Sequence, residues 1–283
     1  MSTSNNRPRQ QTLFLTLAMP FLLACANLPA LGATDTLSHS PPKRNYFGSY
    51  LSDAGYLYSA PARWKGKDWL TLGLISGIGA GIYVFDDDIQ SWTIRNKTTN
   101  SNKFSSVAEK FGNTSYTSLA LGASFLTGLV SDNHKMQKVS LLALKSNLLS
   151  GVLAQTIKNI GHRSRPNANL GKNSWHGPKI GGSHKAFPSG HTTTAFALAT
   201  TFARIYKDKK WVGITAYSLA GLAGLSRIHD NKHWGTDVFA GALLGYFSAL
   251  AILRNEERNL RKISIGTSYF MDTQGMAIVI PLF

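Results

Sequence analysis

The sequence predicts an all-α protein, a bundle of about six core helices with a short C-terminal β-hairpin. Six apolar segments have helical length, and their many Gly, Ala, Ser and Thr residues permit close helix–helix approach. Only the C-terminal end alternates apolar and polar residues as strands do. The 283 residues suffice for one domain or at most two, and the single cysteine cannot form an internal disulfide. An apolar fraction of 43% with 16% charged residues excludes a disordered chain.

Residues 1–33 have the pattern of a secretory signal peptide. Arg7 and Arg9 precede an apolar run over residues 13–31, and small residues follow it at a potential cleavage site. Two alternatives stay open, an uncleaved anchor and a lipid attached at Cys25. In either case we expect the protein in the cell envelope, in the periplasm of a bacterium.

Residues 34–64 are rich in Pro, Ser and Tyr without a helical period, so we expect an N-terminal arm laid over the domain. The domain itself is expected over residues 65–262. Its six predicted core helices are Trp69–Phe85, Ser118–Val130, Val139–Ile157, Thr192–Tyr206, Trp211–Leu225 and Val238–Leu253. The polar stretch Asp86–Asn113 has helical spacing of its apolar residues and predicts two short amphipathic helices.

Residues 263–283 predict the C-terminal hairpin. Apolar residues alternate on both sides of a turn sequence at 272–275. Two strands cannot close a membrane barrel, which needs at least about eight. We therefore expect the hairpin to pack on the helical bundle.

The predicted helices are poor candidates for membrane spans. A span needs about 20 apolar residues, most of these segments are shorter, and Lys145 lies in the middle of the third. The basic loops His134–Lys138, Lys207–Lys210 and Arg254–Lys262 also fall on the outer side if a cleaved signal precedes six spans, against the positive-inside rule. This favours a periplasmic bundle that does not span, with an integral membrane protein as the alternative.

Three polar clusters lie at the ends of the predicted helices. They are Lys158 and Arg165 after the third helix, Ser189, Gly190 and His191 before the fourth, and Arg227, His233 and Asp237 between the fifth and sixth. In an up-and-down bundle all of these positions share one end, so the side chains can converge. A formal net charge of +16 independently predicts an anionic partner, either phosphate, an anionic membrane surface or nucleic acid.

Each cluster by itself is commonplace, but together the side chains suit a phosphate group. Arg165 and Arg227 can grip phosphate oxygens with their planar forks, and Lys158 adds a point charge. Ser189 and Gly190 precede a helix, whose N–H groups and dipole attract anions.

The remaining three residues supply acid and base chemistry. His233 and Asp237 are four residues apart and share a helical face if the helix begins by His233. A carboxylate on one imidazole nitrogen sets the tautomer and leaves the other nitrogen free to attack. His191 remains as a general acid for a leaving group.

The three clusters resemble the signature motifs of the type 2 phosphatidic acid phosphatase (PAP2) superfamily, which includes lipid phosphate phosphatases, bacterial class A acid phosphatases and vanadium haloperoxidases. The resemblance covers about Trp69 to Leu253 and implies a PAP2-like helical bundle. It implies that His233 forms a phosphohistidine, that Asp237 orients His233, and that His191 protonates the leaving group. The phosphate-binding residues that it implies are Lys158, Arg165, Arg227, Ser189 and Gly190. It implies no metal and no other cofactor.

The sequence therefore predicts a metal-independent phosphatase for phosphomonoester or pyrophosphate bonds, with lipid phosphates as the favoured substrates. The alternatives are a periplasmic acid phosphatase for soluble phosphomonoesters, a vanadate-dependent haloperoxidase, and a non-catalytic anion- or lipid-binding protein. Nucleic acid is disfavoured as a partner because the cations cluster at phosphate motifs and loops. The oligomeric state stays open.

The segment between the first two motifs is expected to form a lid or entrance over residues 166–187. Trp175 within it would either contact a lipid tail or anchor the loop. Five residues near the motifs are weaker candidates for substrate contact, and we expect them in solvated loops: His162, Arg163, His184, Lys185 and His229.

Overall fold

The computed structural model describes residues 46–182 and 184–267. The predicted signal peptide at 1–33 lies outside the described residues. The helices are α2 (Tyr46–Tyr58), α3 (Gly66–Val84), α4 (Asp86–Arg95), α5 (Thr99–Ala108), α6 (Thr114–Val130), α7 (His134–Gly161), α8 (Gly190–Ile205), α9 (Lys210–His229) and α10 (Gly235–Thr267). Short 3-10 helices lie at η1 (Ala60–Arg63), η2 (Glu109–Gly112) and η3 (Pro166–Ala168). The predicted all-α class is confirmed for the described residues, with helices at the six predicted positions and two short helices after the first of them. The first of the six, α3, was wrongly expected in the core, because it has no buried residue.

Two sequence expectations about secondary structure were wrong. Within the predicted arm, residues 46–58 form helix α2 and pack against α7 and α10. The structure does not support the C-terminal hairpin, because residues 263–267 are the last turn of α10. No Gly or Pro occurs from 246 to 265, and extending an existing helix costs little. Residues 268–283 lie outside the described part.

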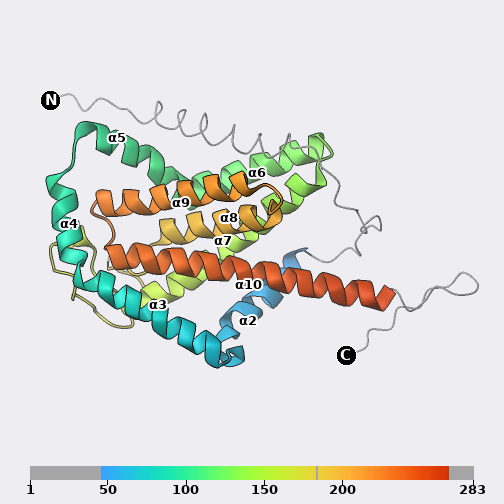
Figure 1. Cartoon of the computed structure of the whole chain (residues 1–283), viewed down its shortest axis with the longest axis horizontal. Helices are drawn as coiled ribbons and strands as arrows, with labels where there is room; N and C mark the ends of the chain where they lie inside the picture. Colours follow the sequence, from blue (N-terminus) through green and yellow to red (C-terminus); the bar gives the residue numbers. More distant parts are fainter. Residues whose placement is uncertain (1–45, 183, 268–283) are drawn as a thin grey trace, which may run out of the picture.

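Helix α8 lies at the centre of the bundle and packs against α7, α9 and α10 (Figure 1). Its buried side chains are small, mostly Ala and Thr, which lets neighbouring helices approach closely. Gly245 of α10 faces α8 where a Cβ atom would overlap the Thr193 carbonyl oxygen. The α8–α10 interface therefore requires glycine at this position.

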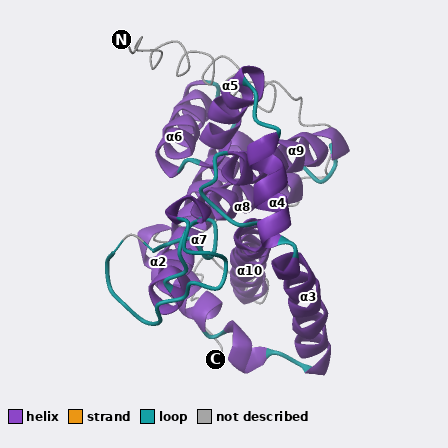
Figure 2. Cartoon of the chain, turned by 90° about the vertical axis from the view of Figure 1, so that its left-hand side faces the viewer, coloured by secondary structure: helices purple, strands orange, loops and turns teal. Residues whose placement is uncertain are grey.

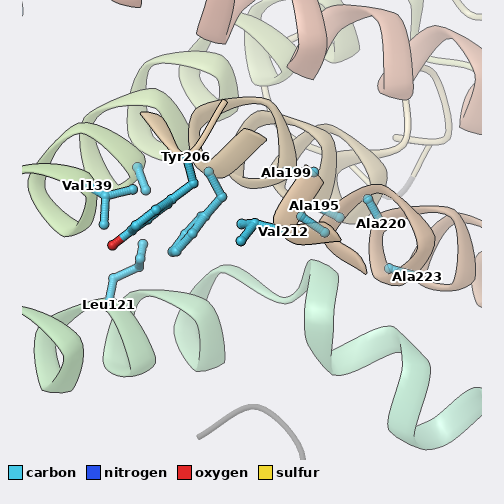
Figure 3. Packing of buried hydrophobic residues seen from close by; sticks show 11 residues of the cluster. Leu121, Val139, Ala195, Ala199, Tyr206, Val212, Ala220 and Ala223 are labelled. Carbon is cyan, nitrogen blue, oxygen red and sulfur yellow. The ribbon is translucent and has the colours of Figure 1, made fainter. Parts of the chain in front are cut away.

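The main hydrophobic core joins α6, α7, α8 and α9. Figure 3 shows Leu121, Val139, Tyr206 and Val212 converging from these helices and the turn after α8. A row of alanines, Ala195, Ala199, Ala220 and Ala223, continues the core along α8 and α9 toward the ends that carry the second and third polar clusters. This close packing holds the ends of α8 and α9 in a defined position.

A buried charged pair attaches α2 to the bundle. Lys145 Nζ donates to Asp53 Oδ2 at 2.8 Å and to Ser49 Oγ at 2.7 Å, and Asn255 Nδ2 donates to Asp53 Oδ1 at 2.6 Å. The charge of Lys145 is thus satisfied inside the protein by a helix that the sequence interpretation had missed. Its position in the middle of α7 therefore does not count against a membrane location.

Helix α3 projects away from the bundle (Figure 2) and has no buried residue. Its exposed apolar side chains include Trp69, Leu70, Leu74 and Ile78. By length and composition, one described helix could cross a membrane, Gly235–Asn259 of α10, or two if the bent pair α3 and α4 counts as one span. Half of the most apolar stretch of α10 is buried inside the protein, so its apolar composition by itself is weak evidence for a membrane span.

Candidate active site

The ends of α7, α8, α9 and α10 meet at one end of the bundle, as the up-and-down arrangement predicts. The Ser189 N–H donates to the Asp237 carbonyl at 2.8 Å, which ties the start of α8 to the start of α10. The His233 N–H donates to the Arg227 carbonyl at 3.2 Å, which ties the turn before α10 to the end of α9. The chain reverses between these helices at Asn231, whose φ of 57° suits asparagine.

His233 and Asp237 form a buried pair. The imidazole is 4% exposed and the carboxylate is fully buried. His233 Nδ1 lies 3.6 Å from Asp237 Oδ2, an ion-pair distance too long for a hydrogen bond, and Nδ1 has no other partner among the described residues. Burial lowers the His233 pKa to about 4 against the opposing effect of Asp237. The imidazole is therefore neutral at pH 7 and keeps a lone pair for attack.

The predicted cations surround this pair. Lys158 Nζ donates to the Lys185 carbonyl at 2.8 Å and to the Pro188 carbonyl. Burial lowers the Lys158 pKa to about 8. The Nε atoms of Arg165 and Arg227 are buried without a hydrogen-bond partner among the described residues. Because unsatisfied buried donors are costly, an anion that accepted these hydrogen bonds would be favoured.

His191 occupies the first turn of α8 beside these cations. Burial, together with the nearby Arg227, His233, Lys158 and Arg165, lowers its pKa to about 3. Helix η2 closes one side of this position, since a Cβ at Gly112 would lie 2.5 Å from the His191 carbonyl oxygen. His191 is thus neutral at pH 7 and lies in a strongly positive field.

Ser189 and Gly190 lie where α8 begins, but only part of their predicted role is available. The Ser189 amide is already used by the Asp237 carbonyl, and the Ser189 hydroxyl accepts from Thr192 Oγ1 at 2.9 Å. The backbone anion donors must therefore come from the following N–H groups of the first α8 turn, which lack intrahelical acceptors. Gly190 faces the Lys158 side chain, whose Cε would lie 3.8 Å from a Cβ there.

Two carboxylates that the sequence analysis did not select contact Arg227. Its Nη1 pairs with Glu109 of η2 and with Asp230, the latter at 3.3 Å. Glu109 lies far from the three motifs in sequence, and no spacing rule connects it to them. In the structure it is held beside Arg227 because η2 packs against α8 and α9.

Arg163 was expected in a solvated loop, and this expectation was wrong. Its side chain is fully buried and donates to Asp237 Oδ1 at 2.7 Å and to Asp86 Oδ2 at 2.8 Å. The period-two alternation of an extended segment would place Arg163 and Arg165 on the same side, so their spacing did not indicate different surroundings. The structure separates them by their contacts, because Arg163 pairs with two buried carboxylates, whereas the Arg165 Nε has no hydrogen-bond partner among the described residues.

Most of the other weaker candidates lie in or contact the loop over residues 166–187. Trp175 packs against Phe187 with ring centroids 5.5 Å apart and against Gly161, so it makes the contacts of a loop anchor. His162 is buried and its Nε2 lies 2.6 Å from the Gly181 carbonyl oxygen. The remaining three have the following contacts: His184 with Ser164, His229 with Ser101, and Lys185 through its carbonyl with Lys158.

No cluster of three or more His, Cys, Asp or Glu side chains that could hold a metal ion occurs within residues 46–182 and 184–267. The candidate site brings together three basic side chains, two histidines, the Asp237 carboxylate and the N-terminus of α8. Such a site can bind a phosphate group, attack it and protonate a leaving oxygen.

Comparison with known proteins agrees with this chemistry. The family model of the PAP2 superfamily matches residues 140–261, a segment that includes all eight predicted site residues. It is 46% identical over 61 residues to the lipid A 1-phosphatase of Porphyromonas gingivalis, covering 21% of this chain and 14% of that protein. It is 34% identical over 129 residues to lipid phosphate phosphatase 1 of Arabidopsis thaliana, covering 35% and 38%.

The chain therefore spans well under half of each of these two curated relatives. Among solved structures, it is similar to a transmembrane PAP2 type phosphatidylglycerolphosphate phosphatase from Bacillus subtilis. The TM-score is 0.45 with 21% identity, over 75% of this chain and 94% of that one.

Proposed function

We propose that this protein is a metal-independent phosphatase that hydrolyses lipid phosphates through a phosphohistidine. The main observation that supports this proposal is that a neutral, buried His233 lies beside Asp237 and is surrounded by Lys158, Arg165 and Arg227. The two guanidinium groups with unpartnered Nε atoms suit the oxygens of a phosphate group.

The reaction proceeds in two steps. The negative charge of Asp237, 3.6 Å from Nδ1, favours the Nδ1–H tautomer of His233, whose Nε2 attacks phosphorus and forms the N–P bond. His191 gives its proton to the leaving oxygen as the P–O bond breaks. Neutral His191 then takes a proton from water, the water oxygen attacks the phosphohistidine, and phosphate leaves with His233 restored.

Substrate binding allows His191 to take up, from the solvent, the proton that it needs. The pKa of His191 is about 3 because burial and four basic or histidine side chains disfavour the charged form. A phosphate dianion opposes that field and therefore raises the pKa. Proton uptake thus accompanies binding of the dianion, and the acid is charged only when a leaving group is present.

A lipid substrate is supported by apolar surface beside the site. A groove of about 920 Å³ lies between α3, α4 and α9 and is lined almost entirely by apolar atoms. Ile228 and His229 contribute to its wall, and they directly follow Arg227 on α9. The curated relatives named above are described as phosphatases of lipid A and of lipid phosphates.

The same proposal places the protein at an envelope membrane with α3 in the hydrocarbon. This helix is about 28 Å long at 1.5 Å per residue, close to the roughly 30 Å of a bilayer core. Many of its apolar side chains, including Leu70 and Leu74, are exposed, which contact with water would disfavour. The exposed face therefore favours the integral membrane alternative over the periplasmic bundle.

Membrane attachment is tested by washing membranes of expressing cells with alkaline carbonate. We expect the chain to stay in the pellet and to need detergent for release. The double variant Leu70→Lys, Leu74→Lys should weaken attachment, whereas Arg95→Gln at the exposed end of α4 should not. Release of the unaltered chain by carbonate would contradict the membrane proposal.

Phosphatase activity is tested on the purified protein with EDTA present. The panel contains an aryl phosphate, phosphatidic acid, phosphatidylglycerol phosphate and a polyprenyl pyrophosphate, and free phosphate is measured. We expect release from at least one lipid at a kcat/KM at least tenfold above that of the aryl phosphate. Preference for the aryl phosphate would favour the soluble-substrate alternative. Absence of phosphate release from every substrate would contradict the proposed function.

A further inference from the structure

Asp237 is held by a buried charged network that the three signature motifs do not contain. Asp86 at the start of α4, Arg163 after α7, and Thr236 and Asp237 at the start of α10 are all buried. These residues come from three separate parts of the chain. Their contacts converge on the carboxylate that faces His233.

The Arg163 guanidinium joins the two carboxylates. Nη1 donates to Asp237 Oδ1 at 2.7 Å, and Nη2 donates to Asp86 Oδ2 at 2.8 Å. Nη1 also donates to Thr236 Oγ1 at 2.7 Å, and that hydroxyl donates to Asp86 Oδ2 at 2.5 Å. Aromatic rings of Tyr83, Trp175 and Trp234 surround the guanidinium at 4.9 to 5.3 Å and exclude water from it.

Both oxygens of Asp237 are therefore constrained. Oδ1 accepts from Arg163, and Oδ2 accepts from the Trp234 N–H at 2.8 Å while lying 3.6 Å from His233 Nδ1. The carboxylate cannot rotate without losing a charge-assisted hydrogen bond. Its orientation toward the imidazole is thus determined by Arg163, which is itself fixed by Asp86.

The charges of the network also matter for His233. One guanidinium between two carboxylates leaves a net charge of −1. If Arg163 paired with Asp237 alone, its positive charge would cancel the negative charge that the imidazole faces. The negative charge of Asp86 balances Arg163, so the imidazole still faces a net negative charge. The other groups acting on His233 are the cations Lys158 and Arg165, which lower its pKa, with His191 also nearby.

We propose that Arg163 and Asp86 are positioning residues of the reaction, which orient Asp237 and set the basicity of His233 through it. The inference rests on the proposed function for its catalytic consequence. Its electrostatic part concerns His233 alone and can be measured whether or not a substrate is known. Both residues act through Asp237 and do not touch the substrate.

Removing each charge should shift the His233 pKa in opposite directions. Asp86→Asn removes a negative charge, so the imidazolium becomes less favourable and the pKa falls. Arg163→Gln removes a positive charge, so the pKa rises. We expect shifts of about half a pH unit or more each way. Thr236→Val removes the bridging hydroxyl without changing charge and should shift the pKa least.

The shifts are measured by NMR titration of the full-length protein with labelled histidine, with the His233 signal assigned through His233→Gln. Where substrate is hydrolysed, the acid limb of kcat/KM should move with the measured pKa. We expect kcat to fall about 10- to 100-fold in both charge variants while KM changes less than threefold, as for other groups that orient catalytic side chains. Thr201→Val, a buried hydroxyl in α8 outside the network, is the matched control and should keep both values.

Folding of every variant is checked by circular dichroism and thermal unfolding. If Arg163→Gln does not fold, the proposal is tested by Asp86→Asn alone, and a lower His233 pKa in that variant supports it. An unchanged or higher His233 pKa in folded Asp86→Asn overturns it, as do shifts of the same sign in both charge variants. Absence of phosphatase activity in the wild type would count against the proposed function and would leave the pKa comparison to decide the electrostatic proposal.

Discussion

His233→Ala is expected to lower phosphate release by about four orders of magnitude or more, because it removes the atom that forms the bond to phosphorus. The other imidazole of the site, His191, is assigned to protonation of the leaving oxygen and does not replace His233 as the nucleophile. The variant should still bind inorganic phosphate, because Lys158, Arg165 and Arg227 remain.

The measurement is rapid quenching with a ³²P-labelled substrate, which traps a phosphorylated protein in the wild type. The label should be stable in base, labile in acid, and absent from His233→Ala. His134→Ala is the control, since the His134 side chain is 82% exposed at the far end of α7. A His233→Ala protein with undiminished turnover, or with the label retained, would rule out His233 as the nucleophile.

Gly245→Ala is expected to destabilise the protein by about 3 kcal/mol, although alanine normally favours a helix by up to about 1 kcal/mol. The new Cβ would meet the Thr193 carbonyl and lie 2.9 Å from the Ala197 nitrogen, both backbone atoms of the central helix. Neither atom can move without displacing α8, which carries His191 at its start. Steric overlap therefore outweighs helix propensity at this position.

The expected change is a fall in Tm of roughly 6–12 °C, at 2–4 °C per kcal/mol for a chain of this size. Gly221→Ala in α9 is the matched control, because a Cβ there meets no atom within 4 Å. It should raise the Tm slightly. A Gly245→Ala protein as stable as Gly221→Ala would show that α8 and α10 do not pack as closely as described.

The helices and the motifs at their ends could be predicted because both are local properties of the chain. A run with 3.6-residue periodicity forms a helix in almost any surroundings that bury its apolar face. The alternation of up and down helices then brings the helix ends that carry Lys158, His191, Arg227 and Asp237 together. The assignment of roles to these side chains stays a proposal.

Helix α2 was missed because its pattern is mixed in composition. Tyr46, Tyr50, Asp53 and Leu57 recur at helical spacing, but two tyrosines and an aspartate do not look like an apolar face. These residues can form a buried helix face because Lys145 supplies a buried partner for Asp53. The C-terminal alternation failed for the converse reason, because a short period-two pattern does not stop a helix that is already propagating.

What could be read directly from the amino-acid order was the all-α class, the helix positions and the set of residues that suits phosphate. The tertiary structure decided which charges are buried together. The sequence spacing does not connect Asp86, Glu109 or Arg163 to the motifs. In the folded protein Arg163 contacts Asp237, and Asp86 of α4 contacts Arg163. Glu109 of η2 contacts Arg227. Electrostatic coupling depends on distance in space and on burial, and neither quantity is a property of the sequence in one dimension.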